Sequence, residues 1–132
     1  MEETVLSVAS LNKVYANGAR SIRVLDDINL NVTSGERLAI VGSSGSGKTT
    51  LLGLCAGLDA PSEGDISLFG QSIVKLSEDE KAALRNAHIG FIFQNFQLVP
   101  TLTALENVMI PLELKANPKA KQLATAMLER VG

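Results

Sequence analysis

Residues 42–49 have the amino-acid types and the spacing of a loop that binds phosphate groups. Their sequence, GSSGSGKT, fits the pattern GxxxxGK[ST]. Glycines allow the backbone to turn tightly, so that successive N–H groups can point at phosphate oxygens. Lys48 would place a positive charge at the β- and γ-phosphates, and Thr49 would offer a hydroxyl ligand to Mg²⁺. The pattern therefore predicts that the chain binds a nucleoside triphosphate together with Mg²⁺.

Such a loop needs a strand before it and a helix after it. Residues 37–41 are a short apolar run bounded by Gly42, which is typical of a buried parallel strand. Residues 48–58 repeat leucines at helical spacing and predict an amphipathic helix, whose positive end would face the same phosphates. These flanking patterns support the loop. The loop alone does not separate one class of ATPase from a GTPase, a kinase or a motor.

The remaining elements follow from hydrophobic patterns and turn residues. Strands are predicted over residues 4–14, 24–33, 65–69 and 88–93, the last of them buried. Further helices are predicted over residues 78–86, 103–114 and 118–131. Ser77 and Glu80 would form a capping box at the first of these helices, and Pro118 fits the first turn of the last.

The bulk composition limits the classes of protein to consider. With 132 residues, 45% hydrophobic and 20% charged, the chain has the size and mixture of one small globular domain. A net charge of −2 argues against a general nucleic-acid binder. A single cysteine, Cys55, excludes an internal disulfide. The longest apolar run, residues 51–58, is far shorter than the ~20 residues of a transmembrane helix, so a role at a membrane would need a partner.

Five further stretches carry a more specific signal than the loop. They are LNKVY at 11–15, VLDDINL at 24–30, AGLD with PSEGDI at 56–66, IGFIFQ at 89–94 and TLTALENV at 101–108. Together with the loop, they resemble ABC ATPase subunits, most closely the subgroup that serves macrolide-type export and lipoprotein release. The resemblance extends from about residue 5 to residue 132 and so covers nearly the whole chain.

The resemblance implies roles for particular residues. Tyr15, the only tyrosine, would stack on the adenine ring, and Gln94 of the Q-loop would contact Mg²⁺ and the attacking water. Lys48 and Gln94 are the expected catalytic residues, and Thr49 and Gln94 the expected metal ligands. The residues expected to contact the nucleotide are Tyr15, Gly42, Ser43, Ser44, Gly45, Ser46, Gly47, Lys48, Thr49 and Thr50.

Other residues that could carry chemistry have a simpler interpretation. Asp59 is expected to be a carboxylate at a helix end or in a loop, without a catalytic role. Cys55 lies on the apolar face of the predicted helix and is expected in the core. His88 does not match the family's switch histidine, which comes much later in the chain. The apolar residues of segment 96–99 fit either core packing or a groove for a permease helix.

The resemblance also implies a fold and a domain organisation. The expected fold is an α/β P-loop NTPase core of the RecA-like type, with an antiparallel β subdomain at its N-terminal side. Residues 1–94 would form the β subdomain and part of the P-loop core, and residues 95–132 would begin the helical subdomain. The sequence lacks the LSGGQ signature, the Walker B aspartate with its catalytic glutamate, the D-loop and the switch histidine. This chain alone is therefore expected to hydrolyse ATP negligibly, and its central strands to have exposed apolar edges. It would then pair with another copy or rearrange its sheet.

The function implied is that of an ATP-binding subunit that couples ATP binding and hydrolysis to export or lipoprotein release. Its expected partners are a membrane permease and a second copy of the subunit, with no nucleic acid. The expected location is cytoplasmic, on the inner face of the cell membrane. Three alternatives remain: a soluble ABC protein without a permease, another P-loop NTPase such as a GTPase, and an interaction fragment that does not use nucleotide.

Overall fold

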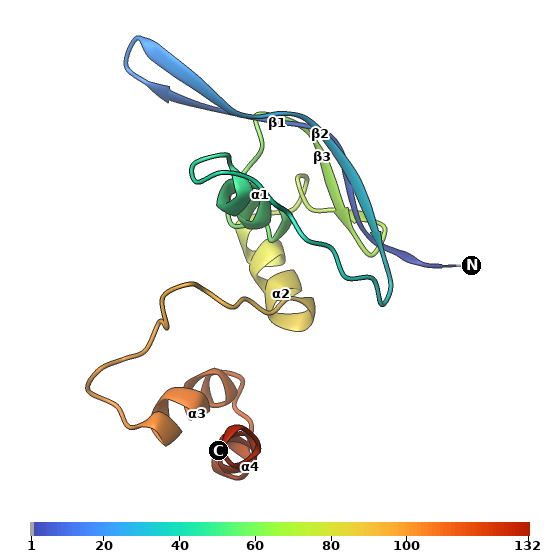
Figure 1. Cartoon of the computed structure of the whole chain (residues 1–132). Coiled ribbons are helices and arrows are strands. Elements are labelled where there is room, and N and C mark those ends of the chain that lie inside the picture. The colour runs from blue at the N-terminus through green and yellow to red at the C-terminus, as the bar shows by residue number, and fades with distance from the viewer. Residues whose placement is uncertain (1) are drawn as a thin grey trace. The chain divides into compact units, whose positions relative to one another are not determined.

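A long β-hairpin opens the chain in the computed structural model, which describes residues 2–132 (Figure 1). Strand β1 (Thr4–Asn17) pairs antiparallel with β2 (Arg20–Thr33) along most of its length. The two strands are joined by Gly18 and Ala19, and Gly18 takes the positive φ of 63° that such a tight turn favours. Both predicted strands are confirmed, and both are longer than predicted because their pairing continues to the turn.

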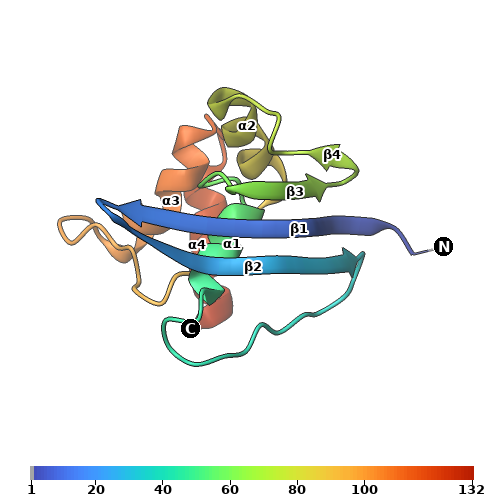
Figure 2. The same cartoon turned by 90° about the horizontal axis from the view of Figure 1, so that it is seen from above.

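Two shorter strands complete the sheet of the described residues (Figure 2). Strand β3 (Glu63–Leu68) pairs antiparallel with β1, and β4 (Gln71–Ser72) pairs with β3, which gives the order β2-β1-β3-β4. Gly64 has a φ of 95° and lies against a bulge in β1, where a Cβ atom would be 2.7 Å from the carbonyl oxygen of Ala9. Only glycine allows β3 to approach β1 so closely.

The helix after the phosphate loop packs its apolar residues against this sheet. Helix α1 (Lys48–Cys55) contributes Leu51 and Leu54 to the core. The other buried residues of this core cluster are Val8, Leu11, Leu25, Ile66, Leu68 and Ile73. The helix ends three residues earlier than predicted, because Gly57 takes a φ of 73° and the N–H of Leu58 bonds to the carbonyl of Gly53 at 2.9 Å.

Helix α2 (Glu78–His88) begins at the predicted capping box. The Ser77 hydroxyl accepts from the Glu80 N–H at 3.2 Å, and the Glu80 carboxylate accepts from the Ser77 N–H at 2.7 Å. The guanidinium of Arg85 donates to the carbonyl of Gly57 at 2.8 Å. This bond ties α2 to the turn that ends α1.

The two strands predicted for the parallel core are not formed. Residues 37–41 and 88–93 include no strand, and among the described residues neither segment pairs with another strand. Val41 is 88% exposed and Ile92 is fully exposed. A strand persists only where a neighbour satisfies its backbone groups, and here the sheet is built from β1 to β4 instead. The prediction of buried strands is therefore wrong for this chain. Apolar edges were expected to be exposed on strands at these positions, but the exposed apolar residues lie in segments without strand structure.

The chain divides into two compact units at residues 90 and 91, and each is described by itself. In the second unit, α3 (Ala104–Leu114) packs against α4 (Ala120–Val131), which buries Ala120 and Ala124. The Asn107 side chain accepts from the Val99 N–H at 2.8 Å and donates to the Thr103 carbonyl at 2.9 Å, so it fixes the turn before α3. Pro118 precedes the N-cap of α4 and is not in the first turn, contrary to the prediction.

Candidate functional site

The glycine-rich loop leads directly into α1. Gly47 is the N-cap of the helix with a φ of 94°, and Gly45 has a φ of 79°. The Ser46 N–H bonds to the Ser43 carbonyl at 3.2 Å and closes a turn within the loop. The positive φ values are ones that side-chain-bearing residues rarely adopt, which explains why the pattern requires glycine at these positions.

Lys48 holds the loop together from its centre. Its Nζ donates to the carbonyl oxygens of Gly42 at 2.7 Å and Ser43 at 2.6 Å, and contacts the Ser46 Oγ at 3.3 Å. An ammonium group has three N–H donors, so the loop satisfies all of them. The Ser46 contact is the longest of the three and is therefore the one that a phosphate oxygen could most readily replace. The positive charge of Lys48 therefore lies inside the loop, where it could bind an anion.

At two glycines of the loop, a side chain would collide with neighbouring atoms. A Cβ atom on Gly42 would lie 2.7 Å from the Ser46 Oγ, inside the curve of the loop. A Cβ atom on Gly47 would lie 3.0 Å from both the Cγ1 and the carbonyl oxygen of Val24, so the loop is seated tightly against β2. Both close approaches explain why these two positions need glycine.

The N-terminal end of α1 suits an anion and a hydroxyl-bound cation. The first turn of α1, which the structure describes completely, contains no Asp or Glu, so its positive dipole end is not neutralised. Thr49 is exposed and Thr50 is half-buried. Among residues 2–132, no group of three or more His, Cys, Asp or Glu could hold a metal ion. Mg²⁺ at this loop would be held by a hydroxyl and by phosphate oxygens, a common mode for this ion.

Tyr15 lies near the end of β1 and belongs to a cluster with two charged residues. Its hydroxyl donates to the Asp59 carboxylate at 3.2 Å, and the Lys13 Nζ lies 4.9 Å from the centre of its ring. Lys13 and Asp59 form an ion pair at 3.2 Å. A hydrogen bond from the Ala60 N–H, with further contributions from Lys13 and Tyr15, lowers the pKa of Asp59 below its usual range. Asp59 lies in a loop, as expected, but its contacts with Lys13 and Tyr15 were not foreseen.

Gln94 belongs to the second unit, where it lies in an exposed, irregular segment. The rings of Phe91 and Phe93 stack just before it, with centres 5.3 Å apart. The phosphate loop and Tyr15 belong to the first unit, so the role of Gln94 at the loop stays a prediction.

Cys55 behaves as expected, whereas His88, which was predicted to begin a strand, ends helix α2. Cys55 is half-buried and packs against the core cluster, and burial raises the pKa of its thiol to about 11. His88 is the last residue of α2, and its ring lies 4.9 Å from that of Phe69. Neither residue belongs to the loop or to the Tyr15 cluster.

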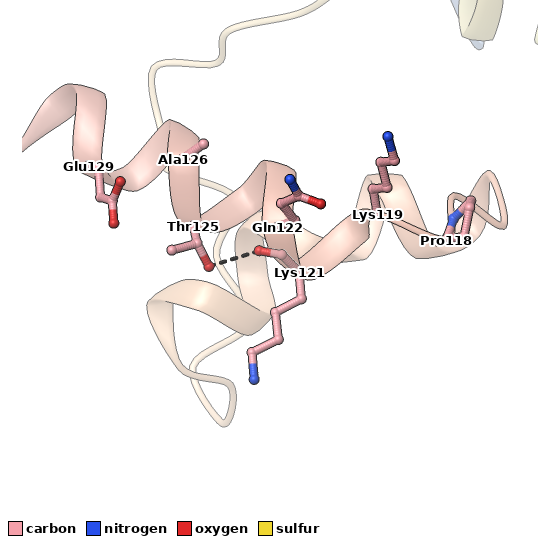
Figure 3. A pocket seen from close by; sticks show the side chains of 7 residues that line it. All are labelled: Pro118, Lys119, Lys121, Gln122, Thr125, Ala126 and Glu129. Atoms are coloured by element: carbon pink, nitrogen blue, oxygen red, sulfur yellow. Dashed lines mark hydrogen bonds between the residues drawn. The ribbon is translucent and has the colours of Figure 1, made fainter.

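The surface of α4 offers no second site of comparable quality. A shallow depression there is lined by Pro118, Lys119, Lys121, Gln122, Thr125, Ala126 and Glu129 (Figure 3). The one hydrogen bond drawn among these residues joins the Thr125 hydroxyl to the Lys121 carbonyl at 2.8 Å, within the helix. The polar groups do not converge on a common point. None of the helices in the described part of the chain has the length and apolar character to cross a membrane.

The loop, the helix behind it and the flanking sheet define a P-loop ATP-binding protein of the ABC type. The chain belongs to the ABC transporter family, whose model matches residues 25–132. It is 50% identical to the lipoprotein-releasing system ATP-binding protein LolD of Pseudomonas syringae, over 99% of this chain and 59% of that protein. It is 44% identical to the uncharacterized ABC transporter ATP-binding protein YbbA of Escherichia coli, over 98% of this chain and 58% of that protein. The chain thus spans less than two thirds of the length of these curated relatives.

Solved structures agree on the fold. The dimeric post-hydrolysis structure of the ATP-binding cassette MJ0796, bound to ADP and Pi, matches with a TM-score of 0.85 and 37% identity. That match covers 94% of this chain and 56% of the cassette. Another dimeric structure of MJ0796 matches with a TM-score of 0.78 and 42% identity, over 83% of this chain and 47% of the other. The predicted fold class, an ABC cassette with an N-terminal antiparallel β part, is confirmed for about half of a full cassette.

Proposed function

We propose that this chain is the nucleotide-binding part of a subunit that couples ATP binding and hydrolysis to lipoprotein release or export through a membrane permease. The observation that carries the proposal is the position of Lys48, whose ammonium is held inside a glycine-rich loop at the start of α1. Membership of the ABC transporter family is compatible with both lipoprotein release and export. The names of relatives such as LolD favour lipoprotein release.

The residues of the loop would divide the work of holding the nucleotide. The backbone N–H groups of residues 42–50 and the Lys48 ammonium would bind the phosphates, because both are positive groups at one helix end. The Thr49 hydroxyl would bind Mg²⁺, and Tyr15 would stack on the adenine. Gln94 would contact Mg²⁺ and the attacking water. ATP itself supplies the phosphoanhydride bond whose cleavage drives the cycle.

Hydrolysis would need more than these residues. The sequence has no LSGGQ segment and no Walker B motif with its glutamate, and so no group to orient or deprotonate the water. We therefore expect the chain by itself to hydrolyse ATP negligibly. We expect turnover from the whole gene product, as a dimer of the kind that MJ0796 forms.

The permease would dock on the second unit, at the cytoplasmic face of the membrane. Phe96 is 87% exposed and Leu98 is 64% exposed in the irregular segment before α3. Exposure of this kind is more typical of an interaction surface than of core packing, because burying these side chains against a partner would be favourable. Co-purification of the whole gene product with an integral-membrane protein would support this arrangement over a permease-free ABC protein.

Calorimetric titration of the whole gene product with Mg-ATP tests the nucleotide site. We expect binding by the unaltered protein and a loss of at least tenfold in affinity for Lys48→Ala, since removal of one charged donor costs about 1.5–3 kcal/mol. Lys75→Ala, which removes a positive charge after β4, serves as the matched control and should bind normally. Equal affinities for the unaltered protein and Lys48→Ala would contradict the proposal.

A further inference from the structure

A cluster of mutual contacts near the end of α1 consists of Lys13, Tyr15 and Asp59. Lys13 and Tyr15 are two residues apart on β1 and so project on the same side of the strand. Asp59 comes from the loop that follows α1. Each member contacts the other two: hydroxyl to carboxylate at 3.2 Å, ammonium to carboxylate at 3.2 Å, and ammonium to ring centre at 4.9 Å.

The Lys13 side chain is fixed by several contacts. Its Nζ donates to the carbonyl oxygen of Ala60 at 2.6 Å, in addition to the ion pair with Asp59. Its side chain is only 11% exposed. The ammonium therefore has fixed partners on one side and the π-face of Tyr15 on the other, a favourable arrangement for a cation and an aromatic ring.

Tyr15 remains accessible in spite of these contacts. The residue is 43% exposed, although its hydroxyl is bound and a cation lies over its ring. Because Lys13 occupies one face of the ring, a planar ligand can stack only on the opposite face. The hydroxyl bond to Asp59 limits rotation of the ring, so that this free face keeps one direction.

We propose that Lys13 and Asp59 are positioning residues, which fix the Tyr15 ring so that one defined face receives the base of the bound nucleotide. The proposal rests on the proposed function, in which Tyr15 stacks on adenine. It adds that the loop after α1 sets the orientation of the ring. Lys48 lies at the start of α1, and Asp59 lies in the loop that follows the end of α1.

Affinities for two ligands separate this role from general stabilisation. The whole gene product is titrated with Mg-ATP and with Mg-bound inorganic triphosphate, which carries the phosphates without a base. Stacking on an aromatic residue gives roughly 5- to 100-fold in affinity, so Tyr15→Ala should weaken ATP binding by that factor. Asp59→Ala should weaken ATP binding about two- to tenfold, the range expected for loss of one hydrogen bond. Triphosphate binding should change for neither variant.

Matched variants show whether Asp59 acts through Tyr15. Asp59→Asn keeps an acceptor for the hydroxyl and should recover part of the affinity for ATP. Asp59→Ala should cause no further loss when combined with Tyr15→Ala. Asp79→Ala removes the same charge from the first turn of α2 and should leave both affinities unchanged.

Four results would overturn the inference, one of them together with the stacking role, and a fifth would overturn the proposed function. The inference fails if Asp59→Ala has no effect on ATP, if it weakens ATP and triphosphate equally, or if it still weakens ATP in the Tyr15→Ala background. The proposed function fails if the unaltered protein binds neither ligand. If the unaltered protein binds both ligands equally, the phosphate loop stands and the stacking role falls, together with the positioning role.

Discussion

Replacement of Gly47 by alanine tests whether the phosphate loop is shaped by close packing as well as by backbone conformation. Gly47 has a φ of 94°, in a region that costs a residue with a side chain roughly 1–2 kcal/mol. The new Cβ would also lie 3.0 Å from the Val24 carbonyl oxygen and 3.1 Å from the Leu25 Cδ2. Overpacking of this kind costs typically about 1–3 kcal/mol. The two effects together predict a loss of about 2–5 kcal/mol in the free energy of unfolding.

Two other glycines supply matched controls for this variant. Gly45 has a φ of 79°, but its Cβ would meet none of the described atoms within 4 Å, so Gly45→Ala should cost only the backbone part, about 1–2 kcal/mol. Gly53 lies inside α1 with similar open space, and Gly53→Ala should stabilise the protein by about 0.5–1 kcal/mol.

Urea unfolding of the three variants, followed by circular dichroism, measures these differences directly. The expected order of midpoints is Gly53→Ala above the unaltered protein, then Gly45→Ala, then Gly47→Ala, with unchanged slopes. Equal losses for Gly45→Ala and Gly47→Ala would refute the argument, because they would show that the contacts with β2 contribute nothing. Mg-ATP affinity measured on the same samples shows whether the packing of the loop against β2 also affects nucleotide binding.

Four more predictions concern the surrounding fold. Gly64→Ala should lower the thermal midpoint more than Gly45→Ala, because its Cβ would meet the Ala9 carbonyl oxygen at 2.7 Å. Burial raises the pKa of Cys55 from 9.0 to about 11, so at pH 8 iodoacetamide should react about 100-fold more slowly than in urea. The stability from this neutral thiol is complete below pH 9 and falls as the pH rises toward 11, which urea titrations detect. Ser77→Ala should raise the lowered pKa of Glu80, measured by NMR, although the backbone bond that is its main cause remains.

Features that depend on neighbouring residues in sequence could be predicted with some accuracy. The capping box of Ser77 and Glu80 needs only a spacing of three, and the structure forms it as predicted. The end of α1 is also determined by residues close in sequence, because Gly57 stops the helix. The prediction nevertheless continued the helix to Leu58, because leucines recur at helical spacing up to that residue. The glycine was the better signal, because a positive φ there closes the helix with its own backbone bonds.

Features that depend on distant partners could not be predicted in the same way. Residues 37–41 have the apolar pattern of a buried strand, but a pattern cannot show whether a neighbouring strand is present to pair with. The cluster of Lys13, Tyr15 and Asp59 joins residues 44 and 46 positions apart. Asp59 therefore looked like an ordinary loop carboxylate until the fold placed it against Tyr15.

The phosphate loop is held by defined contacts although the strand expected before it is absent from the described residues. Three causes explain this: the positive φ of Gly45 and Gly47, the bonds from Lys48 to the loop carbonyls, and the close approach of Gly47 to Val24, where a Cβ atom would lie 3.0 Å away. Only the last cause involves the sheet, and it uses β2 of the antiparallel part. The contacts that hold the loop therefore come from the loop itself, from α1 and from β2. It follows that phosphate binding should depend on Val24 and Gly47 more than on residues 37–41.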